Sequence, residues 1–185
     1  MNEQLEAIDR DLRAASSRLA SLVERTDEGA WSRRPGSGGW SAGECVAHLC
    51  LTTEAAVPPL RSAIERLESR GERSGTGYRR DVLGWLLWRS QRETTRMRTR
   101  TKPVFMPEKA DSTADAIARF EAGQSELREL LRRSDGLALT REKMASPFDP
   151  RVQYNVYSAF TILAAHEHRH LGQAERAASA TTPSR

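Results

Sequence analysis

The sequence predicts an all-α protein, a four-helix bundle that forms one domain over residues 1–178 and ends in a flexible tail at 179–185. Three observations support this. Four long stretches repeat apolar residues with a helical period, and no stretch of any length alternates between apolar and polar residues as a strand would. A chain of 185 residues is also long enough to bury a core without a disulfide or a structural metal. Long amphipathic helices pack as bundles, and long connections allow a topology that does not simply alternate.

The first helix is predicted over residues 3–25. Apolar residues recur there every three or four positions, with charged residues on the opposite face. The apolar positions are Leu5, Ile8, Leu12, Ala15, Leu19 and Leu22. In residues 26–39, Pro35 is followed by three glycines, which predicts a connection.

The second helix is predicted over residues 41–69. Ser41 and Glu44 have the spacing of a capping box, in which each side chain accepts a hydrogen bond from the backbone of the other residue. Further along, Pro58 and Pro59 are expected to bend this helix or restart it, because proline lacks an amide hydrogen and clashes with the preceding turn.

An extra helix is predicted inside an insertion at residues 79–95, which begins with a dense apolar run. Residues 89–102 then carry six positive charges and one negative charge, a net +5 compared with +4 for the whole chain. Such a segment is a solvated face, a surface for an anionic small substrate, or a nucleic-acid surface; without a nucleic-acid motif the last is least favoured. The candidate substrate-binding residues are Arg96, Arg98 and Arg100.

The remaining long helices are predicted at residues 112–134 and 155–178. Ser112, with Asp115 three residues later, is a typical helix start. The stretch at 137–153 contains two prolines and is expected to be a long crossover without a strand.

Two of the three histidines in the last helix share its apolar stripe. At about 100° per residue, His166 and His170 fall on this stripe, whereas His168 lies about 200° from both. A buried imidazole must satisfy both ring nitrogens. The pair is therefore either two core histidines bonded to backbone or carboxylate groups, or a chelate for one cation. His48 also lies on a core-facing stripe and is the third candidate ligand.

Residues 166–170 also spell HExxH, the metalloprotease pattern, with Glu167 in the position of the general base. That class of enzyme needs a further ligand downstream. The HExxHxxGxxH extension fails because Gln173 and Arg176 occupy its last two marked positions, so we do not favour a protease.

Two segments resemble motifs of the DinB/YfiT-like family, and the accompanying helical layout covers almost the whole chain. W-S-A-G-E-C-V-A-H-L at residues 40–49 is similar to W-S-x-x-E-x-x-x-H-L, and H-E-H-R-H-L-G-Q at 166–173 is similar to H-E-x-x-H-x-x-Q. The resemblance implies an up-down-down-up bundle and one divalent metal, zinc or nickel. Carried over by position, the metal ligands are His48, His166 and His170.

The same resemblance implies enzymes that use a low-molecular-weight thiol such as mycothiol or bacillithiol. We expect a metal-dependent S-transferase that joins such a thiol to a small electrophile, because an open metal site lowers the pKa of a bound thiol below about 8.5. The alternatives are a metal-stabilised stress-response module without turnover, and a metal-dependent hydrolase in which Glu167 or Glu44 helps as a base.

The apolar run in the insertion also bears on assembly. Trp85 and Trp88 lie in one short span with three leucines, more than one face of a surface helix can bury. We therefore expect either a homodimer interface or a lid at this helix, or tryptophans that complete the core of the monomer.

The cysteines and the N-terminus point to a cytoplasmic protein. Cys45 and Cys50 diverge by about 140° on one helix, so they are expected to be small core residues in a reducing compartment. No stretch approaches about eighteen apolar residues in a row, and residues 1–18 lack the apolar segment of a secretory signal. We expect no membrane contact.

Overall fold

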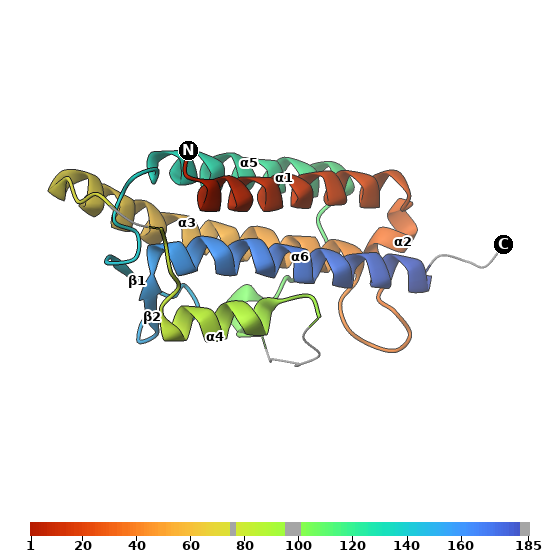
Figure 1. Ribbon diagram of the computed structural model, residues 1–185. Helices are drawn as coiled ribbons and strands as arrows, with labels where there is room; N and C mark the ends of the chain where they lie inside the picture. The colour runs from red at the N-terminus through yellow and green to blue at the C-terminus, as the bar shows by residue number, and fades with distance from the viewer. Residues whose placement is uncertain (75–76, 95–100, 182–185) are drawn as a thin grey trace.

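The computed structural model describes residues 1–74, 77–94 and 101–181. Four long helices lie side by side (Figure 1). They are α1 (Glu3–Glu24), α3 (Ala42–Arg70), α5 (Thr113–Arg133) and α6 (Val156–Thr181). Because α1 and α6 run in one direction and α3 and α5 in the other, the predicted all-α bundle and its up-down-down-up order are confirmed.

The core forms because each helix turns an apolar stripe towards two neighbours. α1 packs against α5 and α6, and α3 packs against the same two helices. The stripe predicted for the first helix is buried along its full length: Leu5, Ile8, Leu12, Ala15, Leu19 and Leu22. Burial of one leucine side chain contributes roughly 1.5–3 kcal/mol, so this stripe is enough to hold α1 on the bundle.

The start of α3 is fixed by the predicted capping box. The Ser41 hydroxyl accepts a hydrogen bond from the Glu44 amide at 3.1 Å, and the Glu44 carboxylate accepts one from the Ser41 amide at 2.8 Å. The helix ends at Arg70 and is capped by Gly71, whose φ of 63° is left-handed and therefore suits glycine.

Pro58 and Pro59 were expected to bend this helix or restart it, and the restart is wrong, since α3 continues through both prolines. Each proline leaves the carbonyl four residues earlier without its helical donor. These carbonyls belong to Glu54, which is exposed, and Ala55, which is partly exposed, so water can bond to them. The buried face of α3 meanwhile packs on the bundle and keeps the helix continuous.

Four short elements lie between or beside the long helices. They are α2 (Glu28–Ser32), the 3-10 helix η1 (Pro103–Phe105), β1 (Lys143–Ala145) and β2 (Gln153–Asn155). β1 and β2 pair antiparallel with Met144 opposite Tyr154. β1 lies inside the stretch at 137–153 where no strand was expected, and β2 begins at its last residue. Strands of three residues are too short to show alternation in the sequence.

The last helix reaches further than the sequence predicted. α6 ends at Thr181, so the first residues of the predicted tail at 179–185 are helical. The Thr181 hydroxyl contacts the carbonyl oxygen of Ala30 in α2 at 3.2 Å, and this contact helps to hold the end of α6.

The helix predicted inside the insertion is α4 (Val82–Gln91), which packs against α6 (Figure 1). Leu87 and Trp88 pack on the core, whereas Trp85 and Leu86 are exposed. Trp88 therefore completes the core of the monomer, while Trp85 remains at the surface.

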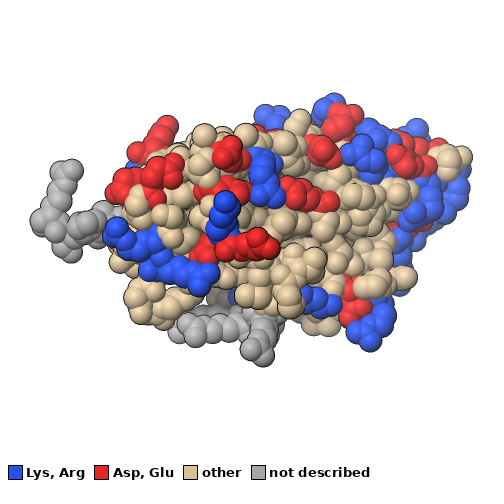
Figure 2. All heavy atoms as spheres, turned by 180° about the vertical axis from the view of Figure 1, so that it is seen from behind, with Lys and Arg blue, Asp and Glu red and all other residues tan. Residues whose placement is uncertain are grey.

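The surface carries charges of both signs. On the face shown in Figure 2, Lys and Arg side chains alternate with Asp and Glu side chains over much of the bundle. None of the helices described is long and apolar enough to cross a membrane.

Candidate metal centre

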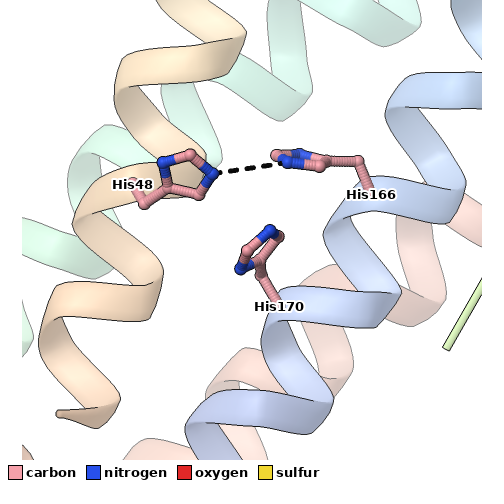
Figure 3. A group of neighbouring side chains, drawn as sticks. All are labelled: His48, His166 and His170. Carbon is pink, nitrogen blue, oxygen red and sulfur yellow. Dashed lines mark hydrogen bonds between the residues drawn. The ribbon is translucent and has the colours of Figure 1, made fainter. Parts of the chain in front are cut away.

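Three histidines from two helices point toward one another (Figure 3). His48 lies in the second turn of α3, and His166 and His170 lie one turn apart on α6, so one face of α6 presents both rings. One nitrogen of each ring lies within 4.8 Å of the other two. The structure thus brings together the three histidines predicted as ligands, and this histidine cluster could hold a metal ion.

His168 lies outside the histidine cluster, as its angle on the helix predicts. Its Nε2 is 3.0 Å from the carbonyl oxygen of Asp11 in α1, and its Nδ1 is 3.4 Å from the guanidinium of Arg18. The His168 ring therefore connects α6 to α1.

A backbone carbonyl orients the His48 ring. Nδ1 of His48 is 2.7 Å from the carbonyl oxygen of Phe105, and because a carbonyl only accepts hydrogen bonds, Nδ1 carries the proton. The lone pair of Nε2 then faces Nε2 of His166, 3.4 Å away (Figure 3). His48 therefore turns an unprotonated nitrogen towards the cluster, which is the form that binds a metal.

The cluster also contains a buried polar atom without a partner. Nδ1 of His170 has no hydrogen bond to any residue that the structure describes. Buried polar groups are nearly always bonded, so this nitrogen calls for an explanation. A cation would supply one only if it bound His170 through Nδ1, the nitrogen without a partner. Zinc and nickel both accept imidazole ligands, so the donor set fits either metal.

Burial keeps the three rings neutral. It lowers the pKa of His166 to about 3 and the pKa of His170 well below its usual value. Burial also lowers the pKa of His48, although the hydrogen bond to Phe105 acts in the opposite direction. Neutral imidazoles can donate their lone pairs at pH 7 without first losing a proton.

Aromatic side chains border the histidine cluster. The centroid of the Trp40 ring lies 4.9 Å from that of His48 and 6.2 Å from that of His170. The ring of Phe148, from the loop between β1 and β2, has its centroid 6.1 Å from that of His166 and 4.7 Å from that of Phe105. No sequence signal marked Phe105 or Phe148 as neighbours of the site, because both lie in short segments without periodicity.

The two glutamates considered as bases lie outside the histidine cluster. Glu167 accepts a hydrogen bond from the Gln124 amide on α5 at 2.7 Å, and burial raises the pKa of Glu167 to about 8. The Glu44 carboxylate caps α3 and binds the guanidinium of Arg34 through both oxygens. Neither carboxyl group is part of the histidine cluster.

The candidate substrate-binding residues Arg96, Arg98 and Arg100 lie outside the described residues. The basic segment re-enters the described chain at Thr101, and there Lys102 donates a hydrogen bond to the carbonyl oxygen of Phe148. One positive charge of that segment is therefore close to the aromatic border of the site.

Histidines that converge from two facing helices define a helical bundle with a candidate metal site in its core. The family comparison agrees with this class: the family model of the DinB superfamily matches residues 11–174, and the chain belongs to that superfamily. The matched residues include all three histidines of the cluster. No curated protein and no solved structure matches the chain.

Proposed function

We propose that the protein is a divalent-metal-dependent enzyme that transfers a low-molecular-weight thiol to a small electrophile. The observation that carries this proposal is the donor set of His48, His166 and His170, three buried neutral imidazoles without a carboxylate among them. A zinc or nickel ion held by neutral ligands keeps its full charge and lowers the pKa of a thiol or water bound beside it.

The protein's own cysteines are poor candidates for the nucleophile. Cys45 and Cys50 are buried, and burial raises the pKa of each thiol to about 12. The thiolate is the reactive form, so neither cysteine reacts readily at neutral pH. Two free, buried thiols also support the proposal of a reducing, cytoplasmic compartment.

The nucleophile would therefore be the thiol of a small molecule. Its proton passes to solvent, its sulfur forms a bond to the electrophilic carbon, and the leaving group departs with the electrons of the broken bond. Trp40, Phe105 and Phe148 limit the access of water to the histidine cluster. Lys102 adds a positive charge nearby, which favours an anionic substrate.

One alternative is favoured by a specific observation. The three histidines are only 2%, 7% and 9% exposed, and a sealed site of this kind would also suit a metal-stabilised module without turnover. A hydrolase is less well supported, because Arg34 binds the Glu44 carboxylate and neither Glu44 nor Glu167 belongs to the histidine cluster.

The deciding experiment measures turnover of a fluorogenic electrophile with a panel of low-molecular-weight thiols. The protein is stripped with a chelator and reloaded with zinc or nickel. We expect turnover with at least one thiol, loss of turnover on chelation, and loss in His48→Ala. His168→Ala is the matched control and should stay active, because His168 lies outside the cluster.

Turnover that survives chelation, or that needs no added thiol, would overturn the proposal. Tight metal binding without turnover for any thiol in the panel would favour the module instead.

A further inference from the structure

A separate cleft lies at the end of the bundle where α3 finishes. It has a volume of about 560 Å³, and its lining includes Arg73, Arg79 and Arg141 and, among the residues that the structure describes, no carboxylate. From His48 to Arg70, α3 rises roughly 33 Å at 1.5 Å per residue, so this cleft is distinct from the histidine cluster. Lys and Arg side chains gather at this end of the molecule, on the right in Figure 2.

The three arginines of the cleft are not neutralised by nearby acids. None of them has a carboxylate within ion-pair distance among the residues described, whereas many arginines elsewhere on the surface are paired. Glu68 is close enough to Arg73 for its pKa to be affected, but the Glu68 carboxylate is held by Arg133 at 2.6 Å. Asp135 also lies close enough to Tyr78, in the lining, for its charge to affect the pKa of Tyr78, so the cleft keeps an excess of positive charge that is smaller than three full groups.

Hydrogen bonds hold the backbone of the cleft at Tyr78 and Arg79. The Gln4 side chain donates to the Tyr78 carbonyl at 2.9 Å and accepts from the Tyr78 amide at 2.7 Å. The Tyr78 ring is buried and stacks on Tyr157 with centroids 5.4 Å apart. The backbone amide of Arg79 donates to the Thr140 hydroxyl at 3.3 Å. The Arg79 side chain therefore projects from a backbone that hydrogen bonds hold in place.

We propose that this cleft binds a small organic dianion of the phosphomonoester type. Guanidinium groups bind phosphate oxygens through paired N–H donors, and three of them around one cleft suit a doubly charged group. Tyr78 and Ala138 also line the cleft, but both are buried, so the apolar surface that they offer to the organic portion of the ligand is small. A cleft of this size has room for more than a single inorganic anion.

Phenyl phosphate is a suitable probe, and calorimetry measures its binding to the full chain. We expect saturable binding of phenyl phosphate, weaker binding of the monoanion phenyl sulfate and none of phenol. Arg79→Ala combined with Arg141→Ala should weaken binding by about tenfold or more. Both substitutions leave the backbone hydrogen bonds of the cleft in place.

The matched control combines Arg61→Ala with Lys109→Ala, which removes two exposed positive charges outside the cleft. Its affinity should stay within about twofold of wild type, allowing for long-range screening. His48→Ala should bind phenyl phosphate as wild type does. The test of this cleft is therefore independent of the test of the thiol transferase proposal.

A second measurement does not depend on variants. Phenylglyoxal modifies exposed arginines, and peptide mapping of the wild-type protein should show protection of Arg79 and Arg141 by phenyl phosphate. Three results would overturn the site: no saturable binding, an equal loss in the control variant, or loss of binding in His48→Ala. The second result would indicate a general electropositive surface, and the third would place the ligand at the histidine cluster.

Discussion

Nδ1 of His48 donates a hydrogen bond to the carbonyl oxygen of Phe105, 2.7 Å away and 57 residues later in the chain. The bond joins α3, which supplies one candidate ligand, to η1, which lies outside the four-helix bundle. Histidine ligands usually donate their second N–H to an acceptor of this kind, and losing it costs roughly 10–100-fold in metal affinity. The orientation of His48 therefore depends on how η1 is held.

Phe105→Ala should weaken metal binding by about tenfold, because the buried Phe105 side chain anchors η1 against Phe148 and so positions the carbonyl. Competition with a chromogenic chelator measures the affinity. Val104→Ala is the control from the same turn, since Val104 is 72% exposed and should have no effect. Equal affinity in both variants would show that η1 does not set the His48 ring.

The second prediction concerns the ligands. Alanine variants of His48, His166 and His170 should each lose the metal, whereas His168→Ala should keep it, because its ring bonds to the Asp11 carbonyl instead. Elemental analysis of the four purified variants decides this. Loss of metal in His168→Ala with retention in His48→Ala would refute the assignment.

Helical periodicity was sufficient to predict the three clustered histidines. Burial selects a stripe on each helix, and histidine is uncommon on such a stripe unless both ring nitrogens are satisfied. The same reasoning correctly separated His168 from its neighbours. What periodicity cannot supply is the partner of each nitrogen.

The carbonyl of Phe105 and the ring of Phe148 illustrate the limit. Both reach the cluster from short segments whose position depends on the packing of the whole chain. The prolines at 58 and 59 illustrate another limit. Local propensity predicted a bend or a restart there, and the packing of α3 on the bundle prevents the restart.

The third prediction is that Cys45 and Cys50 are unreactive in the folded protein. Burial raises the pKa of both thiols to about 12, so the thiolate fraction should stay very small between about pH 7 and 9. Labelling with a disulfide reagent should be slow and should become complete only after unfolding in guanidinium. Free glutathione is the control. Fast labelling of the native protein would contradict the prediction and make these cysteines candidates for the nucleophile.

The fourth prediction is that the protein forms a homodimer through the exposed apolar side chains of α4. Val82, Trp85 and Leu86 of α4 are 79%, 45% and 51% exposed, and a second copy of the chain could cover them. Light scattering at micromolar concentration should give twice the chain mass of 20.7 kDa. Trp85→Asp should shift that mass towards the monomer, while Val104→Asp, a control outside α4, should not. A monomeric wild-type protein would contradict the prediction.

The last prediction concerns stability and pH. Glu142 accepts hydrogen bonds from Arg66, at 2.8 Å, and from Arg70. Burial alone would raise the pKa of Glu142, but the two guanidinium groups outweigh it and lower the pKa below its usual 4.5. The unfolded chain therefore takes up the proton first as pH falls. The stabilisation is present above about pH 4.5 and is lost as pH falls through the lower folded pKa.

Glu142→Gln should accordingly lower the free energy of unfolding at pH 7, but only by about 1 kcal/mol, because both arginine side chains are nearly half exposed and water screens the pair. The difference from wild type should shrink as the pH is lowered towards about 3, where the wild-type carboxyl also becomes neutral. Urea unfolding at a series of pH values measures it. Glu126→Gln, which breaks the exposed pair with Arg61, should change stability little at any pH. A difference that stays constant with pH would mean that Glu142 acts through packing, and that its charge contributes nothing to holding the β1 hairpin against α3.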